Sequence, residues 1–476
     1  MMNFLRLFDR APILWAVLPA FLLAAAGCSP VVETAPPVPS AALPAASLTP
    51  SAAARIPTAA GALLPTTLPE PSATLPVVTP TLSTPSETPF PGLTNEGLPP
   101  GEGAFLLPLT IRHLTEERAV LFFELQEPAG GYLLYQQIQP EVGNTRAIPL
   151  ASGETRHLLT LEGLTPGSEY LALVGLVEAG GGLRQPLFQG EGWGEVRIRT
   201  LSGEGPLRVG VFGDASFGDP ATGALVQEMA GRALDFVIHT GDVVAEIHEN
   251  SGPPEAYALK YYQTLSALLH RMPVYTVIGN HDYDAAARWQ DSVFYYYAFP
   301  PFPDPLFGDP PQPGKNQYYA FAAGGVQFLM LDTQVIFGQE GRQAQQDWLA
   351  ERLADPRFRA SIPVFHVPPF FSGSVHPGDQ LPVRQSWHPL FVSAAAPLAL
   401  SGHSHHYERL SADGITYIVT GGGSSILYAP GEMQAQSQLF ARRTHFVLLE
   451  IHPDRIDLTA IDREGELFDQ AAGPLP

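Results

Sequence analysis

Leu207-Arg-Val-Gly-Val-Phe-Gly-Asp214 is a short apolar run that ends on a carboxylate. The same arrangement recurs at four later positions, where apolar runs are followed by Asp242, Asn280-His281, His366 and His403. Short apolar runs that alternate with amphipathic stretches are typical of an α/β layer architecture. We therefore predict that these polar residues stand at the carboxyl ends of strands, the edge at which α/β sheets bind ligands.

The segments after Pro206 alternate between apolar runs and amphipathic stretches. The strands predicted from the apolar runs are Leu207–Phe212, Phe236–His239, Val274–Ile278, Val326–Leu331, Pro363–Phe365, Leu398–Leu400 and Ile415–Val419. The helices predicted from the amphipathic stretches are Ala221–Ala233, Glu255–Leu269 and Gly341–Leu353. The proline- and aromatic-rich stretch Phe299–Gly314 is interpreted as a surface loop that walls a substrate cleft.

Residues 104–203 carry short alternating apolar runs that are separated by glycine and proline turns. Regular short strands of this kind predict an all-β sandwich. The stretch Leu161–Tyr170 resembles the corner before a late strand of fibronectin type III domains. This region offers no candidate for catalysis, so the chemistry is expected in the residues that follow it.

The N-terminus has the layout of an export signal. Arg6 and Arg10 precede the apolar stretch Ala11–Leu23, which runs into a small-residue segment that ends at Cys28. The apolar stretch is shorter than the ~20 residues of a membrane-spanning helix, which makes a transmembrane anchor the less favoured alternative. The Ala-Gly-Cys junction resembles a bacterial lipobox, which implies that residues 1–27 are removed and that the sulfur of Cys28 is acylated.

Residues 28–103 are rich in proline, alanine, serine and threonine and cannot form a core. We interpret them as a tether that holds an exported protein away from the membrane, facing the periplasm or the cell exterior. The net charge of −21 argues against nucleic-acid binding, so membrane contact is expected through the lipid anchor alone. Cys28 is the single cysteine, which excludes an intramolecular disulfide.

Two motifs carry most of the functional signal. They are Gly279-Asn280-His281-Asp282 and Gly402-His403-Ser404-His405-His406-Tyr407-Glu408-Arg409. Together with Asp214, Asp242 and His366, the ordered set resembles the calcineurin-like metallophosphoesterase family, and the longer motif resembles its purple acid phosphatase branch. The resemblance implies a four-layer α/β sandwich over residues 206–470, with mixed sheets flanked by helices. In that branch a fibronectin type III-like domain commonly precedes the catalytic domain.

The resemblance also implies a ligand set for two divalent or trivalent metal ions, which would be iron, manganese or zinc. Asp242 would bridge the two ions, and the first ion would also be bound by Asp214 and His405. The second ion would be bound by Asn280, His366 and His403. Carboxylate oxygens and imidazole nitrogens suit these metals.

Three further residues are candidates for catalysis. His281 is expected not to bind metal but to protonate the leaving oxygen, with Asp282 orienting it. His376 lies ten residues after His366, in a loop where the branch often places a histidine that faces the substrate. His376 is therefore the alternative proton donor.

The sequence departs from the family at the first metal. The branch has a tyrosine three residues after the bridging aspartate, and other family members have a histidine two residues after the first aspartate. Here these positions hold Ala245 and Ser216. Glu246, His248 or water could complete the ligand shell, and the sequence does not choose among them.

The expected function is hydrolysis of a phosphorylated small molecule by a hydroxide that the two ions generate. The alternative is a catalytically weak phosphate-binding or adhesion protein with a degraded first-metal site. The absent tyrosine favours the alternative, and the presence of every other ligand opposes it. Monoester or diester preference and oligomeric state stay open.

Overall fold

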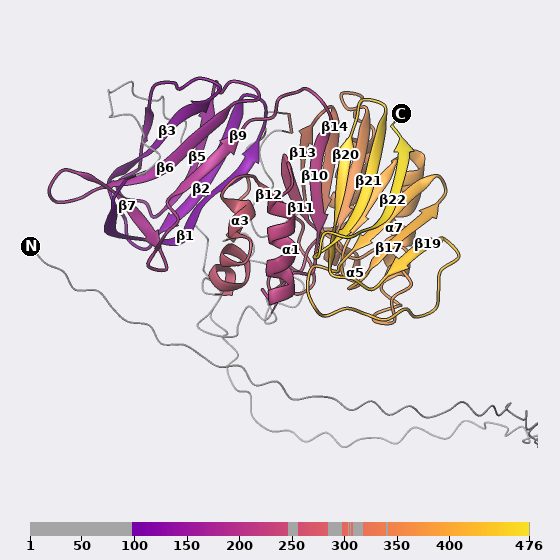
Figure 1. Ribbon diagram of the computed structural model, residues 1–476. Helices are drawn as coiled ribbons and strands as arrows, with labels where there is room; N and C mark the ends of the chain where they lie inside the picture. Colours follow the sequence, from indigo (N-terminus) through magenta and orange to yellow (C-terminus); the bar gives the residue numbers. More distant parts are fainter. Residues whose placement is uncertain are drawn as a thin grey trace, which may run out of the picture. The chain divides into compact units, whose positions relative to one another are not determined.

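The computed structural model describes residues 98–245, 256–283, 298–302, 304, 306–307, 318–338 and 341–475 of this chain. All of them belong to one compact unit that runs from Ser72 to Pro476. The predicted signal peptide, Cys28 and most of the predicted tether lie outside the described residues, as do Glu246, His248 and much of Phe299–Gly314. Figure 1 shows an all-β region followed by a region of sheets and helices.

The all-β region contains nine strands. These are β1 (Pro100–Leu114), β2 (Arg118–Leu125), β3 (Gly131–Gln139), β4 (Arg146–Pro149), β5 (Arg156–Glu162), β6 (Glu169–Val177), β7 (Leu183–Phe188), β8 (Glu191–Gly192) and β9 (Glu195–Arg199). The order is β4-β3-β6-β7-β1-β2-β5, with β8 on β7 and β9 on β6. At the predicted corner between β5 and β6, the hydroxyl of Tyr170 accepts a hydrogen bond of 2.8 Å from the backbone N–H of Thr165. This bond fixes the turn into β6.

Two mixed sheets follow. The first has the order β12-β11-β10-β20-β21-β22, formed by β10 (Leu207–Phe212), β11 (Phe236–His239), β12 (Val274–Thr276), β20 (His445–Ile451), β21 (Arg455–Asp462) and β22 (Leu467–Pro474). The second has the order β13-β14-β15-β16-β18-β17-β19, formed by β13 (Tyr319–Ala323), β14 (Val326–Leu331), β15 (Ala360–Phe365), β16 (Leu398–Ser401), β17 (Tyr407–Ala412), β18 (Ile415–Thr420) and β19 (Ser437–Ala441). Side chains of both sheets share one buried apolar cluster, as in two layers that pack face to face.

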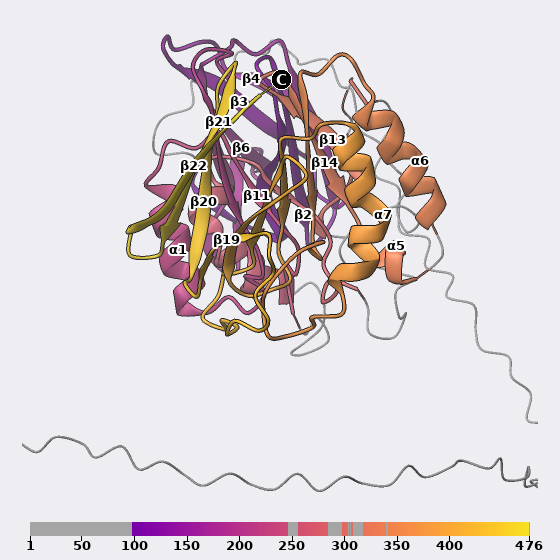
Figure 2. The same ribbon diagram turned by 90° about the vertical axis from the view of Figure 1, so that its right-hand side faces the viewer.

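Helices cover the outer faces of the two sheets. They are α1 (Pro220–Ala230), the π-helical turn η1 (Ala258–Gln263), α3 (Ser266–Leu269), α5 (Gln334–Phe337), α6 (Arg342–Leu353) and α7 (Gln380–Ser393). Figure 2 shows α5, α6 and α7 together beside β13 and β14, with α1 on the opposite side next to β20. The described residues therefore form mixed α/β sheets flanked by helices, in agreement with the expected architecture.

Most predicted strands are confirmed, and one predicted helix is wrong in form. The stretch Glu255–Leu269 was expected as one helix, but its described part divides into η1 and α3 around Leu265. Tyr261 and Tyr262 are adjacent, and both are buried with their rings 5.1 Å apart. A π turn holds more residues than an α turn, which turns consecutive side chains toward the same face and allows both rings to enter the core.

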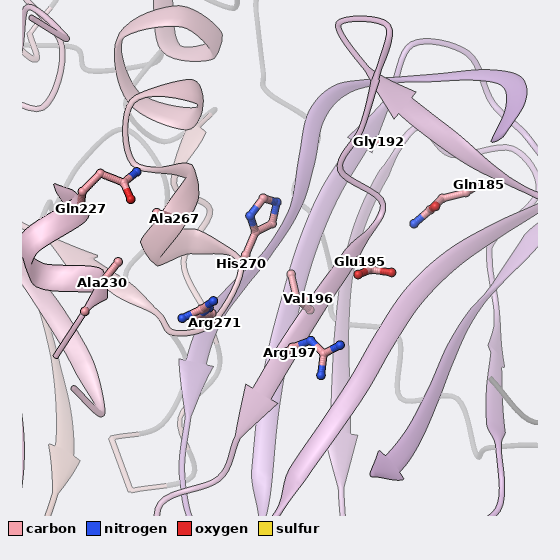
Figure 3. Close-up of a pocket in the computed structure, with 11 residues that line it drawn as sticks. Gln185, Gly192, Glu195, Val196, Arg197, Gln227, Ala230, Ala267, His270 and Arg271 are labelled. Carbon is pink, nitrogen blue, oxygen red and sulfur yellow. The ribbon is translucent and has the colours of Figure 1, made fainter. Parts of the chain in front are cut away.

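A hollow of about 560 Å³ lies where β9 meets the carboxyl ends of α1 and α3 (Figure 3). The N–H of Arg197 donates a hydrogen bond of 2.8 Å to the carbonyl of His270, whose ring packs 4.4 Å from that of Trp193. Burial and the nearby Arg271 lower the pKa of His270 to about 4. The hollow thus marks a polar contact between the all-β and α/β regions, and none of the predicted site residues lines it.

Candidate metal centre

The predicted site residues stand just beyond the carboxyl ends of buried strands. Asp214 follows β10, Asp242 follows β11, and Asn280 follows β12 in the first sheet. In the second sheet, His366 follows β15 directly and His403 follows β16. The pairs β10–β11, β11–β12 and β15–β16 are parallel, which brings their carboxyl ends to the same edge. The prediction from the apolar runs is confirmed at these strands.

The backbone is left-handed at several of these positions. The φ angles are 58° at Asp214, 52° at Asp242, 65° at His403 and 56° at His376. Non-glycine residues seldom adopt such angles, which cost on the order of 1–3 kcal/mol each and cluster at functional sites. The fold therefore maintains strained backbone conformations at the positions where these side chains turn toward a common centre.

Two motif glycines let the chain pass directly behind the carboxylates. A Cβ at Gly279 would lie 2.1 Å from Oδ1 of Asp242, and a Cβ at Gly402 would lie 2.5 Å from Oδ2 of Asp214. Neither position tolerates a side chain, because the contacting atoms belong to buried carboxylates held in place. This accounts for the glycine that opens each of the two motifs.

The residues expected to bind the second ion converge. Oδ1 of Asn280 lies 3.1 Å from Nε2 of His366 and 3.0 Å from Nδ1 of His403. Nε2 of His366 is also 3.3 Å from Oδ1 of Asp242. A metal ion with bonds of ~2.1 Å places neighbouring ligand atoms ~3.0–3.4 Å apart, so these separations fit one shared ion.

The opposite nitrogens of these histidines face acceptors, which determines their tautomers. Nδ1 of His366 lies 2.9 Å from the carbonyl of Thr240, and Nε2 of His403 lies 3.2 Å from Oδ2 of Asp379. Each of these nitrogens must carry the hydrogen, since a carbonyl or carboxylate oxygen can only accept. In the neutral tautomers, the ring nitrogens that face Asn280 carry no hydrogen and present lone pairs to its Oδ1, which is also an acceptor. A cation bound between these acceptor atoms would satisfy all of them.

His405, which is assigned to the first ion, has the same arrangement: one ring nitrogen faces a backbone carbonyl and the other faces a carboxylate. Nδ1 of His405 donates to the carbonyl of Ile426 at 2.9 Å, and its Nε2 faces Oδ1 of Asp214 at 3.4 Å. One ligand atom each from Asp214, Asp242 and His366 lies within 4.8 Å of the others, and all three residues are buried. The centre thus contains two buried carboxylates, Asp214 and Asp242, close to the histidines.

The electrostatic field of the site favours positive charge. Burial alone would lower the pKa of His366, but the adjacent Asp242 and Asp214 raise it to about 10. Burial would likewise raise the pKa of Asp242, yet His366 and His281 hold it well below the ordinary value. A field that retains a proton on a buried histidine at neutral pH also stabilises a metal cation in its place.

His281 and His376 lie at the solvent side of the centre. The N–H of His281 donates to Oδ1 of Asp242 at 2.8 Å, while its side chain is 57% exposed. His376 is exposed, with its ring centroid 5.4 Å from that of His403. Both imidazoles are therefore within reach of a ligand that approaches from solvent.

Asp282 does not occupy the expected place beside the His281 ring. Its Oδ1 accepts hydrogen bonds from the backbone N–H groups of Val243 and Val244, and its Oδ2 accepts from that of Gly279. Burial and the charge of Asp242 raise the pKa of Asp282 to about 7. The carboxyl group ties together the two loops that carry Asp242 and Asn280, so its contribution is to hold these loops rather than to orient His281.

The two positions that depart from the family are neighbours. The N–H of Ala245 donates to the carbonyl of Ser216 at 3.1 Å, and both residues are buried. Two other tyrosines close in sequence to the motifs are engaged elsewhere. The hydroxyl of Tyr283 donates to Asp332, and that of Tyr407 donates to Asp469 at 2.6 Å.

Two residues near the centre have no counterpart in the sequence prediction. Asp379 contacts His403, and Tyr428 stacks on His405 with ring centroids 4.2 Å apart. The position of Asp379 before a helical stretch predicts a helix N-cap and not a site residue. Tyr428 belongs to no motif. Neither contact has a local signal, since each joins residues distant in sequence.

The sequence of this chain is similar to a known protein family and to several known proteins. Residues 207–407 match the calcineurin-like phosphoesterase family. Purple acid phosphatase 15 of Arabidopsis thaliana is 23% identical over 331 residues, which cover 63% of this chain and 58% of the plant protein. Purple acid phosphatase 23 of the same plant is 26% identical over 328 residues, or 62% and 68% of the two chains. An uncharacterized protein of Mycobacterium tuberculosis is 26% identical over 242 residues, or 44% of each chain.

Solved structures share the fold. Purple acid phosphatase PPD1 from yellow lupin seeds superposes with a TM-score of 0.63 at 15% identity, covering 78% of this chain and 74% of that one. A structure of PhoD gives a TM-score of 0.54 at 13% identity, covering 77% and 89%. Residues 207–407 are therefore similar to the calcineurin-like phosphoesterase family, and the chain has purple acid phosphatases among its relatives, in line with the resemblance of the motifs.

Proposed function

We propose that the calcineurin-like phosphoesterase domain of this chain hydrolyses phosphate esters of small molecules with the help of two metal ions. The observation that carries this proposal is the convergence of Asn280, His366 and His403, whose facing atoms lie 3.0 to 3.1 Å apart. The outward nitrogens of both histidines are committed to acceptors, so the inward ones are available for a cation.

Asp242 lies close to residues that we assign to each of the two ions. Its Oδ1 faces His366, and it shares a ligand cluster with Asp214. We assign Asp242 as the bridging ligand, with Asn280, His366 and His403 on the second ion. Asp214 and His405 complete the first. Two bound ions supply the general chemistry of lowering the pKa of water and offsetting charge on the phosphoryl oxygens.

The protein's own proton donor is His281, with His376 as the alternative. The His281 side chain is 57% exposed, and its Nε2 lies 4.0 Å from Oδ2 of Asp242, while its backbone N–H donates to the same carboxylate. This arrangement lets the imidazole meet a leaving oxygen beside the centre. His376 approaches from the loop before α7, on the His403 side. Asp282 supports the reaction indirectly, because it holds the loop that carries His281.

The alternative function is phosphate binding or adhesion by a protein with a degraded first-metal site. Ala245 and Ser216 favour it, because neither supplies the ligand that the family has at its position. The enzymatic proposal is favoured by the intact contacts of the other six residues and by the three histidines whose tautomers all direct a lone pair inward.

The test is turnover of p-nitrophenyl phosphate and of its bis ester by protein loaded with manganese, zinc or iron. Hydrolysis above the metal-only blank supports the enzyme, and the ratio of the two rates gives the monoester or diester preference. The Asp242→Asn variant should lose the activity. Asp457→Asn is a matched control, because Asp457 is a half-buried carboxylate of β21 that pairs with Arg455 and His452 and contacts no residue assigned to the metals. Binding of phosphate without turnover under any metal would favour the alternative.

We also propose that the protein is exported and attached to a membrane through acylated Cys28, facing the periplasm or exterior. Residues 28–103 would serve as the tether, residues 104–203 as a fibronectin type III-like spacer, and residues 206–470 as the catalytic domain. The corner bond at Tyr170 supports the spacer assignment. In the part of the chain that the structure describes, no helix has the length and apolarity to cross a membrane.

A further inference from the structure

Tyr428 lies flat against the imidazole of His405. The two ring centroids are 4.2 Å apart and the planes are inclined by 6°. The same short segment also grips His405 through hydrogen bonds. The N–H of Tyr428 donates to the carbonyl of His405 at 2.8 Å, and Nδ1 of His405 donates to the carbonyl of Ile426 at 2.9 Å. Residues 426–428 therefore fix both the backbone and the ring of His405.

This segment is itself anchored on its far side. The N–H of Ser374 donates to the carbonyl of Ala429 at 3.0 Å, and the N–H of Gly431 donates to that of Ser372 at 2.6 Å. Ser372 in turn bonds through its hydroxyl to the buried carboxylate of Glu408, at 2.6 Å. The backbone that carries Tyr428 is thus held at His405 on one side and at Ser372 and Ser374 on the other.

Among the residues that the structure describes, His405 is the one imidazole that we assign to the first ion. Ser216 and Ala245 supply no ligand, while the hydroxyls of Tyr283 and Tyr407 are bonded to Asp332 and Asp469. With Asp214, Asp242 and His405 as its assigned ligands, this ion loses a large share of its binding if the imidazole rotates. An imidazole turned away from Asp214 also breaks the contact of 3.4 Å between them.

We propose that Tyr428 is a positioning residue for the first metal ion, acting through its ring by holding the plane of His405. The inference rests on the proposed function, because it assigns a role within the same two-ion centre. The ring face, and not the hydroxyl, makes the contact. Phenylalanine should therefore replace Tyr428 with little loss, whereas leucine should not.

The experiment is a calorimetric titration of chelator-treated protein with manganese or zinc, comparing wild type, Tyr428→Phe and Tyr428→Leu. Wild type should show one tighter and one weaker site. Tyr428→Phe should keep both affinities, and Tyr428→Leu should weaken the weaker site by ~10–100-fold, the range for loss of a group that orients a metal ligand. The tighter site should be unchanged in both variants.

Phe440→Leu is the matched control. The Phe440 ring stacks on His406 at 4.3 Å, so this variant removes an aromatic ring from the histidine adjacent to His405, one to which no metal is assigned. It should leave both affinities unchanged. Thermal melting of each variant checks that the fold is retained.

Tyr428→Leu with wild-type affinity at both sites would overturn the role of Tyr428, as would an equal loss in Tyr428→Phe, which would place the effect in the hydroxyl. An intense visible band in the ferric protein that Tyr428→Phe abolishes would overturn it too, in favour of direct ligation. Wild-type protein that binds two ions but hydrolyses no ester would instead overturn the proposed function and leave the metal-positioning role intact.

Discussion

The Nε2 atom of His403 lies 3.2 Å from Oδ2 of Asp379, the residue that immediately precedes helix α7. Asp379 occupies the N-cap position, yet its side chain makes no capping hydrogen bond. The hydrogen bond from His403 lowers the pKa of Asp379 against the opposing effect of its partial burial. A carboxylate that could cap a helix is therefore turned to a histidine that we propose as a metal ligand, an arrangement that would fix the orientation and basicity of that ligand.

Asp379→Ala should weaken the tighter metal site by ~10–100-fold and leave the weaker site unchanged. The affinity of the tighter site in Asp379→Asn should lie between those of Asp379→Ala and wild type, since the amide oxygen still accepts a hydrogen bond from His403 but carries no charge. Calorimetric metal titration measures both affinities. The melting temperature should hardly change, because no cap is lost; a large drop together with unchanged metal affinity would mean that Asp379 is structural.

Asp242→Asn should abolish hydrolysis. The substitution removes charge from the carboxylate that we propose as the bridge between the two ions, while the amide keeps nearly the same volume in a buried position. Metal content by mass spectrometry should fall along with turnover of p-nitrophenyl phosphate. Normal turnover with full metal content would contradict the bridging assignment.

His281→Ala should retain its metal but lose ~10²–10⁴-fold in turnover, the range for removal of a general acid. The loss should be smaller for p-nitrophenyl esters than for alkyl esters, because a good leaving group needs less protonation. The same measurement on His376→Ala shows which of the two histidines donates the proton. An equal loss of His281→Ala for both ester types would point to another role.

The iron-loaded protein should be colourless and should bind its two ions with unequal affinities. The colour of purple acid phosphatases arises from charge transfer between a tyrosinate ligand and ferric iron, and Ala245 cannot supply this ligand. The hydroxyls of Tyr283 and Tyr407 are held by Asp332 and Asp469. Activity and visible absorption recorded during a metal titration should show activity that follows the weaker site, with no intense band.

Cys28→Ala should leave catalysis unchanged and release the protein from membranes, or leave its signal peptide unprocessed. Cell fractionation together with mass spectrometry of the N-terminus measures both effects. Cys28, the residue proposed to be acylated, lies outside the residues that the structure describes. A mature wild-type chain that starts at another residue without acyl groups would exclude the anchor.

The sequence by itself determined the strands and the residues that follow them. β10 and β11 have their predicted bounds, because an apolar run between a turn and a polar residue is a local property of the chain. Asp214, Asp242 and His403 could be placed at the carboxyl ends of their strands for the same reason. The glycines of the two motifs could also be read, since each lies next to the residue that it accommodates.

The tertiary structure decided where the side chains point and which distant residues support them. The carboxylate of Asp282 turns to Val243 and Val244, away from its sequence neighbour His281, because buried backbone N–H groups of another loop require an acceptor there. Asp379 reaches His403 across 24 positions of sequence, and Tyr428 reaches His405 across a hairpin and a loop. Such contacts depend on how sheets and loops pack, and no periodicity or spacing in the chain encodes them.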